Sequence, residues 1–217
     1  MEPSCARLDL DGPLLDGKLR HYYCYKFILE KFNFTPVGID EYWESKRALI
    51  TRLDLLKMSD AEAIYDEFLS LWIGMIEGPE ALALDTVQIG AFDSLERLRS
   101  LSIKLTLVTL RKNKSALDKQ LETTELDKFL DNVLVCDHSE GAEGKVNAVR
   151  SNFGIKGGLE NALWIGDTEV DFMAAKSLGC PIILVANGLR NECYLRSLEG
   201  AEVIPSIRLM REHFDVA

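Results

Sequence analysis

The segment CARLDLDG at residues 5–12 decides the fold class of this chain. Its first four residues are short and apolar apart from Arg7, and the residues after them form a turn rich in Asp and Gly. An apolar run that ends in such a turn is typical of a β-strand followed by a loop. Asp9 and Asp11 therefore lie at the carboxyl end of a strand, where ligands bind in open α/β sheets, and Gly12 lets the backbone turn back.

Short apolar runs recur beyond residue 87. They occupy residues 105–108, 133–135, 162–165 and 182–185. Continuous apolar runs of this length are typical of strands buried on both faces of a parallel sheet. The stretches between them have helical periodicity, at residues 92–101, 115–121, 145–153 and 170–178. Alternating strands and helices predict an α/β fold, a doubly wound, Rossmann-like parallel sheet with right-handed crossovers.

Residues 17–86 interrupt this alternation. Apolar and aromatic residues recur there at intervals of three and four, which predicts helices, and Ser59 is a candidate cap for one of them. We therefore expect a core domain of residues 1–16 and 87–217, with an all-helical domain of residues 17–86 inserted after the first strand.

The composition is that of an ordinary globular protein, with 47% hydrophobic residues and a net charge of -10. This charge disfavours nucleic acid as a partner, because non-specific binding to it depends on Lys and Arg. We expect no membrane contact, since no window approaches the ~18 apolar residues of a spanning helix. The beginning of the chain has no signal-like pattern, so we expect a cytoplasmic protein with five free thiols. The oligomeric state is not readable.

A second acidic cluster lies in the segment WIGDTEVD at residues 164–171. Asp167 follows an apolar strand, and Asp171 lies within the first turn of the next helix. Each cluster alone arises by chance in roughly one chain in twenty, as a solvated turn or a helix cap, but the two together fall well below about one in a hundred. Carboxylates that converge from two strand ends suit a hard cation such as Mg²⁺.

Two further positions suit a phosphate group. Thr109 follows the strand at residues 105–108, and a hydroxyl with backbone N–H groups at a strand-to-helix turn can hold a phosphate. Lys145 lies near the start of a helix, where the helix dipole disfavours a cation unless an anion compensates for it. The alternatives, a strand-end threonine and a solvated lysine, remain open from the residues alone.

In this order the motifs resemble those of the haloacid dehalogenase-like (HAD) hydrolase superfamily, in its phosphatase branch with a C1-type helical cap, similar to phosphoglycolate phosphatases. The resemblance covers nearly the whole chain, and residues 187–189, Asn-Gly-Leu, match the usual continuation. It implies that Asp9 is the nucleophile, which forms an aspartyl-phosphate, and that Asp11 is the general acid and base.

The resemblance also implies a ligand set. Mg²⁺ binds Asp9, Asp167 and the backbone carbonyl of Asp11, and Asp171 assists directly or through water. The transferring phosphoryl group binds Thr109, Lys145, Gly12, Leu110 and Arg111. The implied reaction is Mg²⁺-dependent hydrolysis of a small phosphorylated metabolite.

Three residues depart from the family pattern. Pro13 stands where Thr is usual, Arg7 places a charge in a strand that is normally apolar, and Leu110 follows Thr109 where Asn is frequent. Arg111 is then a candidate for an extra phosphate or substrate contact. The carboxylate of Asp11 favours phosphoryl transfer over dehalogenation, because cleavage of a carbon-halogen bond leaves no oxygen that needs a proton.

Two other functions stay open, a phosphomutase or phosphonate-cleaving relative and a binding or regulatory protein with weakened catalysis. Substrate contacts in the helical domain are not identified by the sequence. The candidates are Arg20, His21, Tyr22, Tyr23 and Arg52, with Lys18, Lys46 and Arg47 as further cations.

Overall fold

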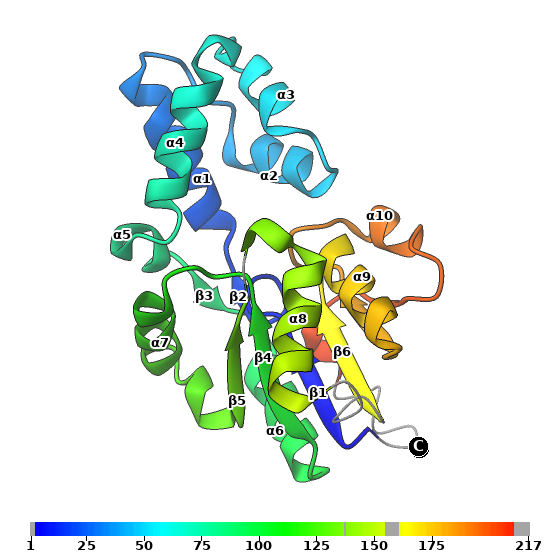
Figure 1. Ribbon diagram of the computed structural model, residues 1–217. Coiled ribbons are helices and arrows are strands. Elements are labelled where there is room, and N and C mark those ends of the chain that lie inside the picture. Colours follow the sequence, from blue (N-terminus) through cyan, green and yellow to red (C-terminus); the bar gives the residue numbers. More distant parts are fainter. Residues whose placement is uncertain (1–2, 137, 155–160, 211–217) are drawn as a thin grey trace. The chain divides into compact units, whose positions relative to one another are not determined.

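The computed structural model describes residues 3–136, 138–154 and 161–210 (Figure 1). The chain forms two compact units. One holds Met1–Leu15 with Val87–Ala217 and is called the α/β unit below; the other holds Asp16–Thr86 and is called the helical unit. The chain passes between the units in two short paired strands, β2 (Leu15–Asp16) and β3 (Thr86–Val87).

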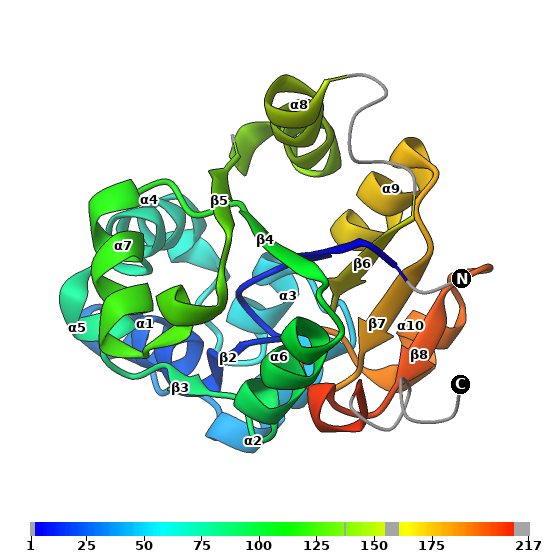
Figure 2. The ribbon, with the colours of Figure 1, turned by 90° about the horizontal axis from the view of Figure 1, so that it is seen from below.

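The α/β unit is built on a six-stranded sheet in the order β5-β4-β1-β6-β7-β8 (Figure 2). The strands are β1 (Cys5–Leu8), β4 (Lys104–Thr109), β5 (Asn132–Val135), β6 (Ala162–Gly166), β7 (Ile182–Val185) and β8 (Glu202–Ile204). Neighbouring strands pair in parallel. The chain adds β4 and β5 on one side of β1 and β6, β7 and β8 on the other. The order reverses beside β1, which is where open α/β sheets bind ligands.

Helices cover both faces of this sheet. They are α6 (Ala91–Ser100), α7 (Lys114–Thr123), α8 (Ala142–Phe153), α9 (Glu169–Leu178) and α10 (Glu192–Arg196), with 3-10 turns at Leu126–Phe129, His138–Glu140 and Ile207–Leu209. Side chains alternate along the strands, so Leu105 and Leu107 pack with α6 and α7, whereas Val108 and Trp164 pack with α8 and α9. The predicted doubly wound α/β fold is confirmed. Strand β8 was not expected, because its three residues begin with an exposed Glu.

Arg7 lies inside the central strand and is 2% exposed. Its guanidinium carbon is 5.9 Å from the centroid of the Phe153 ring, and Nη1 is 3.5 Å from the sulfur of Cys180. The charge of Arg7, which departs from the apolar pattern of such strands, is therefore accommodated on the face of the sheet that α8 and α9 cover. It does not interrupt the pairing of β1 with β4 and β6.

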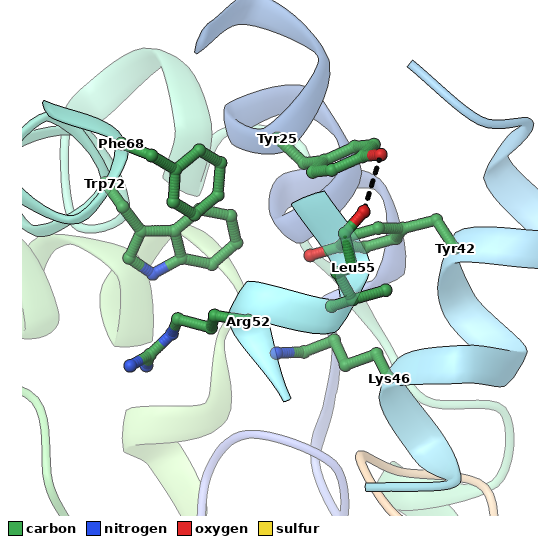
Figure 3. A pocket seen from close by; sticks show the side chains of 7 residues that line it. All are labelled: Tyr25, Tyr42, Lys46, Arg52, Leu55, Phe68 and Trp72. Carbon is green, nitrogen blue, oxygen red and sulfur yellow. Dashed lines mark hydrogen bonds between the residues drawn. The ribbon is translucent and has the colours of Figure 1, made fainter. Parts of the chain in front are cut away.

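The helical unit contains α1 (Lys18–Lys31), α2 (Ile39–Arg47), α3 (Arg52–Lys57), α4 (Tyr65–Met75), α5 (Pro79–Leu82) and a 3-10 turn at Glu62–Ile64. Its interior is aromatic (Figure 3), and it also buries an ion pair in which Arg20 Nε is 3.1 Å from Asp85 Oδ1. The expectation that Ser59 caps a helix is wrong. Its hydroxyl bonds to the Tyr25 hydroxyl at 2.7 Å, and the N-cap residues of the two helices that follow it, Glu62–Ile64 and α4, are Ala61 and Ile64.

None of the helices in the described part of the chain has both the length and the apolar character needed to span a membrane.

Candidate active site

Three carboxylates meet at the carboxyl edge of the sheet. Asp9 directly follows β1, Asp167 directly follows β6, and Asp171 lies in the first turn of α9. One oxygen atom of each lies within 4.8 Å of the others. Asp9 is fixed at the strand end, since its N–H donates to the carbonyl of Ile165 at 3.0 Å. Two of the three side chains are fully buried, and that of Asp9 is 13% exposed.

Glycines make this convergence sterically possible. A Cβ atom at Gly12 or at Gly188 would overlap the carboxylate of Asp167, and one at Gly166 would overlap Asp171. Gly12 also has a φ of +99°, a conformation that side chains oppose. Asp167 thus lies between two backbone segments that only glycine allows so close. The structure therefore places Gly12 beside a carboxylate of the cluster.

Lys145 joins two of the carboxylates. It is 1% exposed on α8, with Nζ 3.0 Å from Asp9 Oδ2 and 2.7 Å from Asp171 Oδ1. Burial disfavours its charge, but attraction to Asp171 and Asp9 is stronger and raises its pKa above the usual value. The anionic compensation expected for a cation near a helix start is therefore present.

Asp171 has more hydrogen-bond donors than Lys145 alone. The Trp164 indole donates to its Oδ1 at 3.2 Å, and the Thr168 hydroxyl donates to its Oδ2 at 2.8 Å. Thr168 and Asp171 form a capping box at the start of α9. Burial alone would raise the pKa of Asp171, but Lys145 and these hydrogen bonds lower it. Helix capping and ion pairing therefore occur at the same residue.

The other two carboxylates are poorly stabilised as anions. Burial, only partly offset by Lys145, and repulsion from Asp171 and Asp11 raise the pKa of Asp9 to about 7. Burial and repulsion from Asp171 and Asp9 raise the pKa of Asp167, against a hydrogen bond from the Leu189 N–H. Oδ1 of Asp167 is buried without a hydrogen-bond partner in the described structure. Oxygen ligands with excess negative charge fit a hard divalent cation, which would satisfy this atom.

The Asp11 side chain lies outside that cluster of three. Its two oxygens accept hydrogen bonds from Arg111, from Nε to Oδ2 and from Nη2 to Oδ1, both at 2.7 Å. The guanidinium is 6% exposed and the carboxylate 20% exposed. Arg111 was singled out in the sequence as a phosphate or substrate contact, and the structure shows Asp11 as its partner.

Thr109 and the loop after Asp11 complete this edge. Thr109 is the last residue of β4 and is 1% exposed, and Leu110 follows it. Two backbone bonds close the first loop, from the N–H groups of Leu14 and Leu15 to the carbonyl of Leu10, at 3.1 and 2.9 Å. Neither bond uses the nitrogen of Pro13. The loop therefore forms without the N–H that proline lacks.

Gln88 was missed by the sequence reasoning. Its side-chain nitrogen donates to the carbonyl of Gly12 at 3.0 Å and lies 3.4 Å from the carbonyl of Asn187. Each carbonyl belongs to one of the two loops that lie against the carboxylate of Asp167. Gln88 lies in none of the motifs, and its position is set by the return of the chain through β3. Both loops had a signal in the sequence, Asp-Leu-Asp-Gly at 9–12 and Asn-Gly-Leu at 187–189.

Comparisons with known proteins agree with this geometry. The family described as "Haloacid dehalogenase-like hydrolase" matches residues 8–185. A phosphoglycolate phosphatase of Rhodobacter capsulatus is 26% identical over 192 residues, which cover 84% of each chain. Pyrophosphatase PpaX of Halalkalibacterium halodurans is 24% identical over 119 residues, 54% of this chain and 55% of that protein.

A solved structure of a haloacid dehalogenase-like family hydrolase from Streptococcus pneumoniae superimposes with a TM-score of 0.77. The two chains are 17% identical, and the superposition covers 98% of each. This likeness shows the fold, and the sequence match covers far more than half of the chain. The protein is therefore an enzyme of the haloacid dehalogenase-like hydrolase family.

Proposed function

We propose that this enzyme is a Mg²⁺-dependent phosphatase that hydrolyses a small phosphate monoester through an aspartyl-phosphate. The observation that carries the proposal is the cluster of Asp9, Asp167 and Asp171, in which Oδ1 of Asp167 is buried without a hydrogen-bond partner among the described residues, while Lys145 pairs with Asp9 and Asp171. The relative from Rhodobacter capsulatus, which is named a phosphoglycolate phosphatase, supports the same reaction class.

Asp9 is the proposed nucleophile. Its Oδ1 accepts the Leu10 N–H at 2.9 Å and its Oδ2 pairs with Lys145, so the carboxylate is oriented by both. Attack on phosphorus forms the bond between aspartate and phosphorus and breaks the bond to the leaving oxygen. Water then attacks the phosphorus and releases inorganic phosphate and free Asp9.

Asp11 is the proposed acid and base in these two steps. It gives a proton to the leaving oxygen and takes one from the attacking water. Both oxygens of Asp11 are bound by Arg111 in the structure, so at least one of those hydrogen bonds has to open during turnover. Arg111 is then released to bind the phosphoryl group or the substrate.

Mg²⁺ is the proposed metal. Asp9, Asp167 and the backbone carbonyl of Asp11 would hold it. Asp171 already accepts hydrogen bonds from Lys145, Trp164 and Thr168, which favours a contact through water for this residue. Bound there, a divalent cation neutralises the charge on the transferring phosphoryl group. Its charge would also allow Asp9 and Asp167 to ionise together.

The phosphoryl oxygens would be bound by Thr109 and Lys145, together with backbone groups of Gly12 and Leu110. Such donors act without reorganisation when the charge develops in the transition state. We further propose that the helical unit is a C1-type cap that contributes substrate specificity, that the substrate is a small phosphorylated metabolite, and that the enzyme acts in the cytoplasm.

A screen of phosphate compounds tests this function. Purified protein is incubated with Mg²⁺ and with sugar phosphates, nucleotides, phosphoglycolate and pyrophosphate, the last two chosen because relatives carry those names. We expect phosphate release that stops on addition of EDTA and in Asp9→Asn. The surface variant Asp118→Asn, whose carboxylate pairs with Lys114, is the matched control and keeps full activity. Absence of turnover across the panel in folded protein would instead support a binding protein.

A further inference from the structure

A second bidentate arginine–carboxylate pair, between Arg190 and Glu169, lies beside the acidic cluster. Arg190 follows β7 in the loop that leads to α10, and Glu169 is the first residue of α9. Arg190 donates from Nε to Oε2 and from Nη2 to Oε1 of Glu169, both at 2.7 Å. The two side chains are 17% and 23% exposed. The pair therefore joins the loop after β7 to the start of α9 by two parallel hydrogen bonds.

This pair closes a ring of contacts that runs through Asp167. The Leu189 N–H donates to Oδ2 of Asp167 at 2.5 Å, and Arg190 is the next residue in the chain. Glu169 lies two residues after Asp167. Arg190 also donates from Nη1 to the carbonyl of Leu189 at 3.1 Å, so its guanidinium binds both segments. The pair thus fixes the Leu189 N–H relative to the carboxylate that accepts from it.

The helix ends on either side do not depend on this pair. The start of α9 is already capped by Thr168 and Asp171. The start of α10 is capped by Asn191, whose side chain accepts from the Tyr194 N–H at 2.9 Å. An ion pair that is partly exposed also contributes little to overall stability. What distinguishes the pair is therefore the carboxylate beside it and not the helices that it joins.

The carboxylate of Asp167 has to keep one orientation to act as a ligand. Its Oδ2 accepts from Leu189, whereas Oδ1 is buried without a hydrogen-bond partner among the described residues. Gly12 and Gly188 pack against this carboxylate and limit its movement, while the Leu189 N–H determines which oxygen is left for a cation. If that N–H moved away, the carboxylate could turn, and a divalent cation would bind less tightly.

We propose that Arg190 and Glu169 are positioning residues for the divalent cation of the acidic cluster. Their pair holds the Leu189 N–H on Oδ2 of Asp167, which leaves Oδ1 for the cation. This inference rests on the proposed metal site and adds to it two residues outside the expected ligand set. Neither residue touches the cation or the substrate, so their effect on turnover passes through the affinity for the metal.

Binding of Mg²⁺ to the full-length protein tests this proposal without any turnover. Titration calorimetry measures the affinity of the wild type, Arg190→Gln, Glu169→Gln and the double variant. Arg196→Gln is the matched control, because it removes the same charge from an arginine that pairs with Glu192 within α10. Amide hydrogen exchange at Leu189, measured by NMR in the presence of EDTA, reports on this N–H in the metal-free protein.

Arg190→Gln should weaken Mg²⁺ binding about tenfold, the low end of the loss that follows removal of a residue that orients a metal ligand. Removal of a positive charge beside the site would by itself strengthen Mg²⁺ binding, so weaker binding indicates lost orientation. Glu169→Gln should act in the same direction, and the double variant should lose no more than Arg190→Gln, because both residues act through one contact.

Exchange at Leu189 should be faster in Arg190→Gln and in Glu169→Gln, because the loop that carries this N–H is then less well held. Arg196→Gln should change neither the Mg²⁺ affinity nor the exchange. The melting temperatures of the metal-free variants are compared, so that a loss of folding is not mistaken for weaker binding.

Unchanged or tighter Mg²⁺ binding in folded Arg190→Gln, or unchanged exchange at Leu189, would overturn this proposal and leave the metal site intact. An equal loss of affinity in Arg196→Gln would also overturn it, by showing a general effect of charge. Absence of Mg²⁺ binding in the wild type would contradict the proposed metal site itself, and the positioning role with it.

Discussion

Arg111 binds both carboxylate oxygens of Asp11, through two hydrogen bonds of 2.7 Å. Such bidentate pairs are among the stronger hydrogen-bonded contacts in proteins and they also fix orientation. Asp11 comes from the loop after β1, and Arg111 comes from the loop after β4. The pair therefore ties together the two loops that would hold the acid and the phosphoryl group.

Replacing Arg111 with lysine should lower kcat/KM by about tenfold, because lysine cannot form the two parallel hydrogen bonds that orient Asp11. Steady-state kinetics on the best substrate of the screen would measure this, with Lys112→Ala as the neighbouring control. An equal loss in kcat and kcat/KM indicates orientation of Asp11, and a rise in KM alone indicates ground-state substrate binding. Unchanged kinetics in Arg111→Lys and Arg111→Ala would remove Arg111 from the mechanism.

Lys145→Met should destabilise the protein by about 3–5 kcal/mol, because it leaves Asp171 buried without its cation. Chemical denaturation measures the free energy of unfolding. The double variant Lys145→Met with Asp171→Asn should recover part of this loss, since the buried charge is then removed as well. A single variant as stable as the wild type would show that the ion pair contributes nothing to folding.

The metal-free protein should become less stable as the pH rises from about 4 to about 7. The pKa of Asp9 is about 7 in the folded protein and near 3.8 when unperturbed. Between these values the folded state binds more protons than the unfolded state, so the free energy of unfolding falls with rising pH. Asp167, whose pKa is also raised, acts in the same direction.

Mg²⁺ should therefore raise the melting temperature more at about pH 8 than at about pH 5, where it competes with protons for the carboxylates. Thermal unfolding with EDTA and with Mg²⁺ at both pH values measures these rises in melting temperature. Asp9→Asn should reduce the difference between the rise at about pH 8 and the rise at about pH 5. A larger effect of Mg²⁺ at the lower pH would contradict the assignment of these carboxylates as ligands.

Gln88→Glu should raise the Mg²⁺ concentration required for half-maximal activity several-fold. The new carboxylate keeps the shape of the side chain but cannot donate to the carbonyl of Gly12, so the loops around Asp167 loosen. Gln120→Glu on α7 is the control away from the site: Gln120 is buried and Gln88 is half-buried, so the control tests the effect of a new carboxylate on stability and should leave the Mg²⁺ dependence unchanged. An identical response of the two variants would show a general effect on stability.

The strand ends and their carboxylates were predictable from the sequence. Asp9 and Asp167 each follow an apolar run, and parallel strands bring their carboxyl ends to one edge. For Lys145, the place near a helix start left two interpretations, a solvated lysine and a lysine with an anionic partner, and the structure shows two carboxylate partners, Asp9 and Asp171. These predictions rest on local pattern and on the geometry of parallel sheets.

Contacts between distant segments were not predictable in the same way. Nothing near Arg111 in the sequence shows that its partner is Asp11, and Gln88 reaches Gly12 only because β3 returns the chain beside the first loop. The Ser59 prediction failed because a hydroxyl near a helix break can also bond to a buried tyrosine, and packing of the helical unit decides between the two. Strand β8 carries too short an apolar signal to stand out.

The most direct test of the central claim is capture of the aspartyl-phosphate. The enzyme is mixed with Mg²⁺ and its best substrate, quenched during turnover and reduced with borohydride, which converts an acyl phosphate of aspartate to homoserine. Peptide mass spectrometry should then find homoserine at position 9 in the wild type, and only when Mg²⁺ and substrate are both present. Full turnover with Asp9 unmodified, or modification at another carboxylate, would contradict the assignment of Asp9 as the nucleophile.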